Sequence, residues 1–349
     1  MRPEPARIEP IFSPRIWGAR SLAPLYPEKI NLQEPLGEAW LTGVDCRLAN
    51  GPFEGKTLGE AWREMPVEWR GTRLASTTHF PLLVKFIFPN DKLSIQVHTD
   101  DAYAAAHEQA AGGRGKSEMW HTVSAESGAR VLVGLKPGAD KEKFLRSLAA
   151  HTLENLFQAH EVKAGDTFFV PAGTPHTIGP GMTLCEVQEY SDLTYRVYDY
   201  GRVDARGKPR ELHIQKALDV IQFGKAAGGK VSQIRLPAQK LHRSLLAACR
   251  YFATERWKDF GALETQSDAD HFDLLVVLTG NGDFSWNGGL AKYQSGHCWF
   301  VPASLGPFAF HPEEPTKILR TYMPDLLALR ASLQQEGHSE QEIAKSVFD

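Results

Sequence analysis

Residues 165–173 read Gly-Asp-Thr-Phe-Phe-Val-Pro-Ala-Gly, and residues 296–304 read Gly-His-Cys-Trp-Phe-Val-Pro-Ala-Ser. Each copy is a glycine turn followed by a short strand that ends in Phe-Val-Pro-Ala. A β unit that occurs twice in one chain indicates two similar β structures. The repeat therefore predicts two β-barrels in tandem.

The segments around the repeat support a mainly β fold. Short apolar runs alternate with glycine and proline turns along most of the chain, which favours barrels over a doubly wound sheet. Helical patterns interrupt these runs, and Ser339 with Glu342 has the spacing of a capping box in a helical C-terminal tail. We expect three parts, with the glycine-rich residues 224–229 as a linker: a first domain over 1–223, a second over 230–323, and the tail over 324–349.

The bulk composition excludes several classes of protein. The 349 residues are 42% hydrophobic and 23% charged, as in globular proteins, and the net charge of −3 gives no basic surface for nucleic acid or anionic membranes. The four cysteines lie far apart and form no CxxC pair, which argues against a disulfide framework and favours a reducing compartment. No run has the length of a signal core or a membrane span. We expect a cytoplasmic protein; monomer and homodimer both stay open.

A polar strand lies in the middle of the first predicted domain. In the stretch Leu93-Ser94-Ile95-Gln96-Val97-His98, strand alternation places Ser94, Gln96 and His98 on one face and Leu93, Ile95 and Val97 on the other. An apolar run over residues 81–88 precedes it, and the turn residues between them predict two adjacent strands.

Four residues are candidate metal ligands: Gln96, His98, Glu118 and His176. Two imidazoles, one carboxylate and one amide oxygen suit zinc or a similar divalent ion. Singly, each residue has an ordinary alternative as a hydrogen-bonded core histidine or a surface carboxylate. In the second copy of the repeat, Pro307 occupies the position that corresponds to His176, so we expect one metal site, in the N-terminal half.

At residues 165–176 the pattern becomes specific. Glycine, five residues, proline, one residue, glycine, two residues and histidine form the second metal-binding motif of the cupin superfamily of jelly-roll barrels. Within that superfamily the chain resembles type I mannose-6-phosphate isomerase in its short bacterial form, most densely over residues 80–222. The motifs that carry the resemblance are Lys92–His98 with Asp100-Asp101, Gly115–Trp120, Phe169–His176, Glu186, Gln188-Glu189, Ser191–Arg196 and Asp199–Arg202.

The resemblance implies a fold of two tandem cupin-type jelly-roll barrels with helical insertions and a helical C-terminal tail. It places one Zn²⁺ per chain on Gln96, His98, Glu118 and His176. It also implies interconversion of mannose 6-phosphate and fructose 6-phosphate through a cis-enediol. The small-molecule partner would then be a sugar phosphate.

Further residues match active-site positions of that family. Arg196, Lys116 and Glu186 would act in catalysis, with Arg196 and Lys116 also binding substrate; Ser94 and Lys85 would contact its phosphate. The three catalytic candidates have simpler alternatives. Arg196 and Glu186 could form a structural ion pair, and Lys116 could lie on the surface. A nearby metal would depress the pKa of Lys116.

Two other functions stay open. An iron-dependent cupin oxygenase is one, although glutamine with a single carboxylate does not fit the common facial triad. A non-catalytic, metal-containing sugar-binding cupin is the other, although Lys116, Glu186 and Arg196 would have no purpose there.

Overall fold

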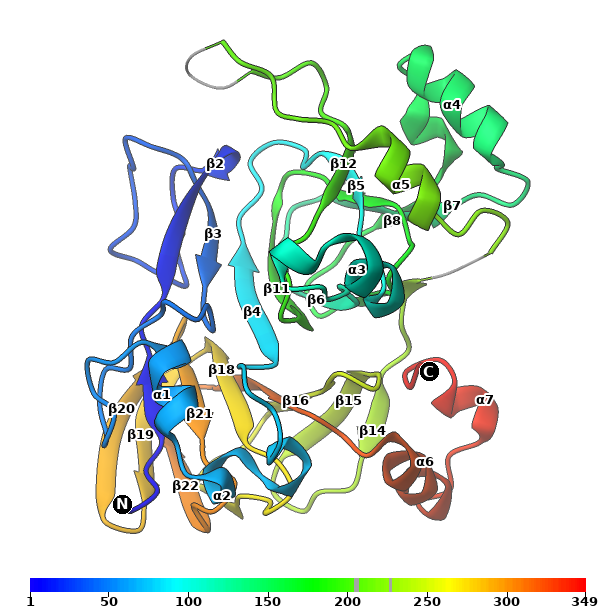
Figure 1. The fold of residues 1–349 in the computed structure, drawn as a ribbon. Coiled ribbons are helices and arrows are strands. Elements are labelled where there is room, and N and C mark those ends of the chain that lie inside the picture. Colours follow the sequence, from blue (N-terminus) through cyan, green and yellow to red (C-terminus); the bar gives the residue numbers. More distant parts are fainter. Residues whose placement is uncertain (204–206, 226–227) are drawn as a thin grey trace.

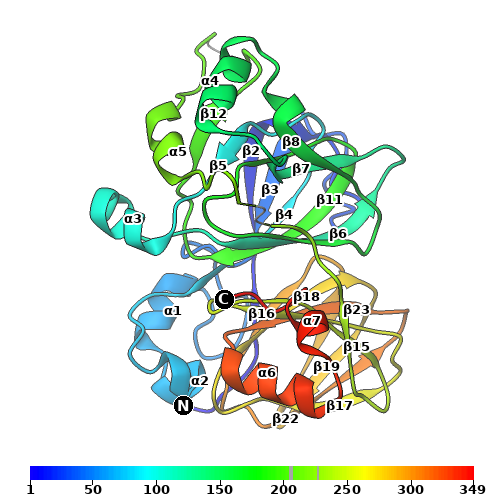
Figure 2. The same cartoon turned by 90° about the vertical axis from the view of Figure 1, so that its right-hand side faces the viewer.

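The two β units predicted from the repeat form two barrels that stack one on the other in the computed structural model, which describes residues 1–203, 207–225 and 228–349 (Figures 1 and 2). Each barrel consists of a seven-stranded sheet and a smaller sheet, and strand pairs are antiparallel throughout both. The predicted mainly β class is confirmed.

The N-terminal barrel carries most of the predicted site. Its larger sheet has the order β13 (Gly229–Lys230), β9 (Thr167–Val170), β6 (Glu118–Ala125), β11 (Met182–Glu189), β4 (Leu82–Ile87), β3 (Leu36–Trp40) and β2 (Ile11–Ala19). Its smaller sheet has the order β12 (Tyr195–Tyr198), β5 (Ile95–Val97), β10 (His176–Ile178), β7 (Arg130–Leu135) and β8 (Phe157–Glu161).

The C-terminal barrel is built in the same way. Its larger sheet has the order β1 (Ala6–Ile8), β21 (Cys298–Val301), β18 (Asp273–Thr279), β23 (Lys317–Tyr322), β16 (Ala253–Lys258), β15 (His242–Ala248) and β14 (Ile234–Leu236). Its smaller sheet has the order β17 (Leu263–Gln266), β22 (Pro307–Pro312), β19 (Asn281–Trp286) and β20 (Gly289–Gln294).

The prediction that residues 81–88 and 93–98 form adjacent strands is wrong. Strand β4 belongs to the larger sheet and β5 to the smaller one, so they face each other across the barrel. The connection crosses the barrel because it is held at both sheets: Asn90 N–H donates to the Trp17 carbonyl, and Leu93 N–H to the Ile178 carbonyl. A turn signal marks a change of direction, but the sheet that the next strand joins depends on these distant partners.

The prediction that Leu93 shares a face with Ile95 and Val97 is also wrong. Since β5 begins only at Ile95, Leu93 does not follow its alternation, and it packs inside the barrel with Trp17 and Trp120. Ile95 and Val97 point outward instead, under the helices that cover the barrel. The covering helices are α4 (Lys141–Ala149) and α5 (Ile214–Val220), with a 3₁₀ turn over Leu153–Leu156; α3 (Asp101–His107) and the 3₁₀ turn Gln109–Ala111 follow β5.

The N-terminal segment connects the two barrels. Strand β1 pairs with β21 of the C-terminal barrel, with Ala6 opposite Phe300. Helix α1 (Leu58–Glu64), which begins with a capping box at Thr57, packs Trp62 against Phe272 with the ring centroids 5.6 Å apart. Helix α2 (Val67–Arg70) and the 3₁₀ turn Thr72–Leu74 follow. The domain boundaries stay predictions.

The helical tail forms as predicted, with α6 (Leu326–Gln335) and α7 (Glu340–Ile343) beside the C-terminal barrel (Figure 2). Its end returns to the N-terminal barrel, where the Phe348 ring stacks on Phe169 at 4.1 Å between centroids. In the predicted linker, Gly229 and Lys230 form β13, whereas residues 226–227 lie outside the described residues.

Two predictions from composition concern the whole chain. All four cysteines are free and buried, as the argument against a disulfide framework predicts. Within the described ranges, no helix is both long and apolar enough to cross a membrane. The cytoplasmic location and the oligomeric state stay predictions.

Candidate metal centre and active-site cavity

Three predicted ligands meet inside the N-terminal barrel. His98 follows β5, His176 begins β10, and Glu118 begins β6 of the facing sheet. His98 Nε2 lies 3.5 Å from Glu118 Oε2, and His176 Nε2 lies 3.4 Å from Glu118 Oε1. Each of the three residues is at most 1% exposed. Among the residues that the structure describes, these three are the His, Cys and carboxylate group whose geometry could hold a metal ion.

Backbone carbonyls fix both imidazoles in an orientation that suits metal binding. His98 Nδ1 lies 2.9 Å from the Leu193 carbonyl, and His176 Nδ1 lies 2.9 Å from the Thr174 carbonyl. Each Nδ1 therefore carries the proton and donates it, which leaves the Nε2 electron pair of each ring facing Glu118 as a possible metal ligand. Lys116 Nζ also lies 3.3 Å from His98 Nε2. Burial lowers the pKa of both rings, that of His176 to about 4, so both are neutral at pH 7.

Glu118 and Gln96 complete a donor set that fits a divalent metal. Oε1 of the buried Glu118 carboxylate has no hydrogen-bond partner, a costly state that a metal cation would relieve, whereas Oε2 contacts Lys116 Nζ at 2.8 Å. Gln96 lies opposite His176 in the β5–β10 ladder, with its Nε2 3.3 Å from His176 Nε2. Because amide oxygen and nitrogen are assigned rather than observed, a flip of this side chain presents an oxygen to the centre.

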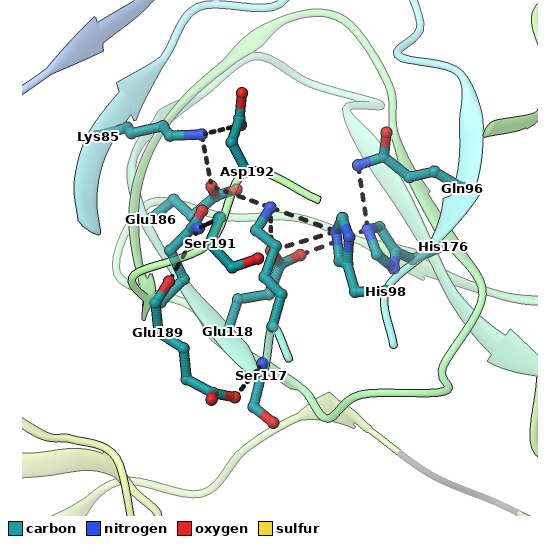
Figure 3. Close-up of polar contacts among 12 residues, drawn as sticks. Lys85, Gln96, His98, Ser117, Glu118, His176, Glu186, Glu189, Ser191 and Asp192 are labelled. Carbon is teal, nitrogen blue, oxygen red and sulfur yellow. Dashed lines mark hydrogen bonds and ion pairs between the residues drawn. The ribbon is translucent and has the colours of Figure 1, made fainter. Parts of the chain in front are cut away.

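A chain of alternating charges begins beside this group. Lys116 Nζ lies 2.8 Å from Glu118 Oε2 and 3.7 Å from Glu186 Oε1. Lys85 Nζ lies 3.8 Å from Glu186 Oε1 and 3.3 Å from Asp192 Oδ1. Figure 3 shows Lys85, Glu186 and Asp192 on one side of Glu118, with the two imidazoles on the other. The alternative pairing of Glu186 with Arg196 is wrong, because Glu186 lies between two lysines.

This arrangement shifts the pKa of both central groups upward. Burial would lower the pKa of Lys116, but the carboxylates of Glu118 and Glu186 outweigh burial and raise it. Burial raises the pKa of Glu186, although Lys116 acts against it. The expected depression of the Lys116 pKa depends on a metal charge; the protein groups alone keep this lysine protonated. Lys116 also precedes β6 rather than lying within it.

The cavity beside this chain of charges has a volume of about 400 Å³, and it is lined by Lys85, Lys116, Glu186 and Asp192. Its lining includes Ser94, Lys85 and Arg196, as the sequence predicts, and three residues that the motifs missed: Arg15, Arg210 and His213. Arg196 Nη1 donates to the Glu211 carbonyl at 3.0 Å, whereas its buried Nε has no partner. An anion in the cavity would therefore meet a free guanidinium donor.

The missed residues left no signal in the local sequence. Arg15 lies on β2, outside residues 80–222 where the family resemblance is densest, and forms an ion pair with Glu38 at 2.5 Å. Both residues line the cavity. Arg210 reaches it from the loop after β12, where its Nε donates to Asp199 at 2.8 Å. Neither position has strand or helix periodicity that would point to the site.

Comparison of the sequence with known families and proteins gives one consistent answer. The model of the type I phosphomannose isomerase catalytic domain matches residues 6–123. A mannose-6-phosphate isomerase from Streptococcus mutans is 37% identical over 314 residues, which cover 88% of this chain and 95% of that protein. The mannose-6-phosphate isomerase ManA from Bacillus subtilis is 33% identical over 315 residues, which cover 88% of this chain and 96% of that protein.

Solved structures agree. The mannose 6-phosphate isomerase from Bacillus subtilis superposes with a TM-score of 0.82 at 28% identity, covering 91% of this chain and 99% of that one. A putative mannosephosphate isomerase from Archaeoglobus fulgidus, at 20% identity and a TM-score of 0.71, shares the fold over 93% of this chain and 99% of its own. The sequence relatives match over nearly their whole length at more than 30% identity, and the chain therefore belongs to the type I phosphomannose isomerase family.

Proposed function

We propose that this chain is a zinc-dependent aldose–ketose isomerase that interconverts mannose 6-phosphate and fructose 6-phosphate through a cis-enediol. The observation that carries the proposal is the buried His98–Glu118–His176 group beside the Lys116–Glu186 pair, open to a cationic cavity. The names of the sequence relatives support the choice of substrate.

Gln96, His98, Glu118 and His176 would hold one zinc ion. Such an ion supplies positive charge that stabilises the negative charge developing on the sugar oxygens as the enediol forms. The protein supports this by keeping the two imidazoles neutral and by leaving Glu118 Oε1 without a hydrogen bond.

Glu186 and Lys116 are the proposed proton-transfer pair. The reaction removes a proton from the carbon next to the carbonyl and returns it to the neighbouring carbon. Glu186 suits this step because burial raises the pKa of its carboxyl group and thereby its affinity for a proton. Lys116, 3.7 Å away, stays cationic and can donate a hydrogen bond to a substrate oxygen.

The arginines of the cavity are the proposed phosphate clamp. A guanidinium binds phosphate oxygens in fork geometry, and Arg196 has a free Nε for this purpose. Arg15 and Arg210 line the same cavity. Ser94 and Lys85 stay predicted phosphate contacts, although Lys85 already has two carboxylate partners.

The deciding experiment is a coupled assay of purified, zinc-loaded protein on mannose 6-phosphate, with fructose 6-phosphate followed as product. We expect turnover that chelation abolishes and added zinc restores. Absence of turnover at high protein concentration would overturn the isomerase proposal.

The metal assignment needs its own test, a His98→Ala variant analysed for bound metal and for activity. We expect both to fall together. Full activity without His98 would show that zinc does not sit on these residues.

A further inference from the structure

A second cavity lies between the two barrels and is separate from the active-site cavity. It has a volume of about 230 Å³ and shares no lining residue with the first. Strand β6 contributes one wall, and β16, β18 and β23 of the C-terminal barrel contribute the other; Figure 2 shows these strands facing each other where the barrels meet. We call this cavity the inter-barrel crevice. Its lining residues are His121, Thr122, Val123, Ala164, Gly165, Arg256, Lys258, Leu278, Thr279 and Lys317.

The crevice has an excess of positive charge. Arg256, Lys258 and Lys317 line it, and no aspartate or glutamate does. Lys258 lies directly opposite Lys317 in the β16–β23 ladder, a pairing of like charges that destabilises a sheet unless something compensates it. Lys258 has an ion pair with the exposed Asp259 at 2.8 Å, whereas Lys317 has no ion pair among the described residues. Part of this charge is thus left without a partner inside the protein.

One polar atom in the crevice also lacks a partner. The buried Nε of Arg256 has no hydrogen bond. Unpaired buried donors are rare because each costs free energy. The Arg256 guanidinium is held in place, since its Nη2 donates to Gln233 Oε1 at 2.8 Å and Gln233 Nε2 donates to the Gly165 carbonyl at 2.7 Å.

The one other titratable group of the lining adds no charge. Burial lowers the pKa of His121 to about 3, and Arg256 and Lys317 act in the same direction. The ring is neutral at pH 7, with its Nδ1 3.0 Å from Thr167 Oγ1. The crevice therefore combines three cations, one of them with a free buried donor, and its lining has no carboxylate among the described residues, a combination that favours an anion.

We propose that the inter-barrel crevice is a second anion-binding site, for a small oxyanion such as inorganic phosphate or the phosphoryl group of a small phosphorylated metabolite. Phosphate oxygens would accept hydrogen bonds from Arg256 and would separate the charges of Lys258 and Lys317. Because one wall is β6, which also carries Glu118, an anion here binds the strand that supplies a candidate metal ligand.

The test is calorimetric titration of the whole protein with inorganic phosphate, for the wild type and four variants. Lys317→Gln removes the exposed lysine that has no ion pair, with little risk to folding, and Arg256→Gln removes the buried donor. Arg196→Gln weakens phosphate binding in the active-site cavity instead. Lys292→Gln, an exposed lysine of the same barrel that pairs with Asp283 and Glu313, is the matched control.

We expect two classes of phosphate site in the wild type and in Lys292→Gln. Lys317→Gln and Arg256→Gln should each weaken one class at least tenfold, and Arg196→Gln should affect only the other. Phosphate binding that is unchanged in both crevice variants would overturn the proposal.

The same titration with glycerol 3-phosphate separates the two sources of the anion. If a phosphorylated metabolite is the ligand, glycerol 3-phosphate should bind the crevice class more tightly than inorganic phosphate does. Equal or weaker binding, again sensitive to Lys317→Gln, assigns the site to inorganic phosphate.

Discussion

The two barrels repeat one architecture, yet among the described residues the candidate metal centre lies in the N-terminal barrel alone. In the N-terminal barrel, Glu118 pairs with Val170 of β9. In the C-terminal barrel, Asp273 pairs with Val301 of β21, and Val170 and Val301 occupy the same position of the sequence repeat. Asp273 is therefore the counterpart of Glu118, and the second barrel has kept a buried carboxylate at this position.

The neighbouring pair has exchanged its charges. Glu186 lies opposite Lys85 in the β11–β4 ladder, and the corresponding pair in the β23–β16 ladder is Arg320 opposite Glu255. Arg320 Nε lies 2.9 Å from Asp273 Oδ1, so a guanidinium of the chain neutralises the carboxylate. Glu118 has a similar cation beside it, because Lys116 Nζ lies 2.8 Å from its Oε2, so an ion pair does not by itself distinguish the two carboxylates.

The imidazoles are the other difference. Gln96 lies opposite His176 in the N-terminal barrel, and Gln266 lies opposite Pro307 in the C-terminal one. Proline has no ligand atom, and the residue two positions after Gln266 is Asp268 where the N-terminal barrel has His98. Aromatic rings such as Phe284 and Phe310, stacked at 4.6 Å between centroids, fill the remaining interior. The two neutral imidazoles, rather than the carboxylate, therefore distinguish the candidate metal centre from its counterpart in the C-terminal barrel.

The largest expected effect comes from the equivalent carboxylates. Glu118→Gln removes the only charged ligand, and we expect loss of bound metal and a fall in kcat on the order of a thousandfold, since a metal contributes several kcal/mol to stabilising transition-state charge. The measurements are metal analysis and the coupled assay.

Asp273→Asn is the matched control, the same chemical change at the equivalent position. It should keep metal and kcat in the folded fraction. A loss of metal in this variant would contradict the assignment of the centre to the N-terminal barrel alone.

The guanidinium of the C-terminal barrel should be structural. Arg320→Met leaves the buried carboxylates of Asp273 and Glu255 without this partner, and breaking a buried ion pair in this way costs about 3–5 kcal/mol. Urea unfolding measures this loss, and the folded variant should retain its kcat. A stability loss below about 1 kcal/mol would show that the network is not needed for folding.

The same ion-pair network predicts that the folded protein loses stability at acidic pH. Although burial alone would raise the pKa of Glu255, hydrogen bonds from Arg243 and the charge of Arg320 lower it to about 2. A depressed carboxyl pKa stabilises the folded state above pH 4.5, and this contribution, about 3 kcal/mol, is lost progressively as the pH falls towards 2. The difference in unfolding free energy between the wild type and Glu255→Gln should therefore shrink by about 1 kcal/mol between pH 7 and pH 3.5. A gap that is constant with pH would contradict the assigned pKa shift.

The smallest expected effect tests contact between the barrels. Tyr251 of the C-terminal barrel donates to Asp101 Oδ2 at 2.5 Å, and Asp101 Oδ1 accepts from Gly115 N–H at 2.9 Å, directly before Lys116. Tyr251→Phe removes a hydrogen bond worth about 1 kcal/mol, and we expect a fall in kcat of about two- to fivefold.

Tyr322→Phe is the control for that variant. Its hydroxyl donates to Glu255 at 3.2 Å within the C-terminal barrel, so its loss should lower stability without changing kcat. Equal effects of both variants on kcat would show that Tyr251 has no specific influence on Lys116.

The sequence by itself determined the repeat, the mainly β class and the candidate ligands. These depend on local regularities: strand alternation placed Gln96 and His98 on one face, and the motif around Pro171 and Gly173 brought in His176. The lack of an imidazole at the position equivalent to His176 was also predictable, because Pro307 stands there.

Only the tertiary structure decided which strands face each other and what closes each barrel. The position of β4 across from β5, the arrival of Arg15 and Arg210 at the cavity, and the ion pair of Arg320 with Asp273 depend on contacts between residues far apart in the chain. The physical reason is that periodicity fixes the face on which a side chain lies, whereas its partners are fixed by how the sheets close and pack.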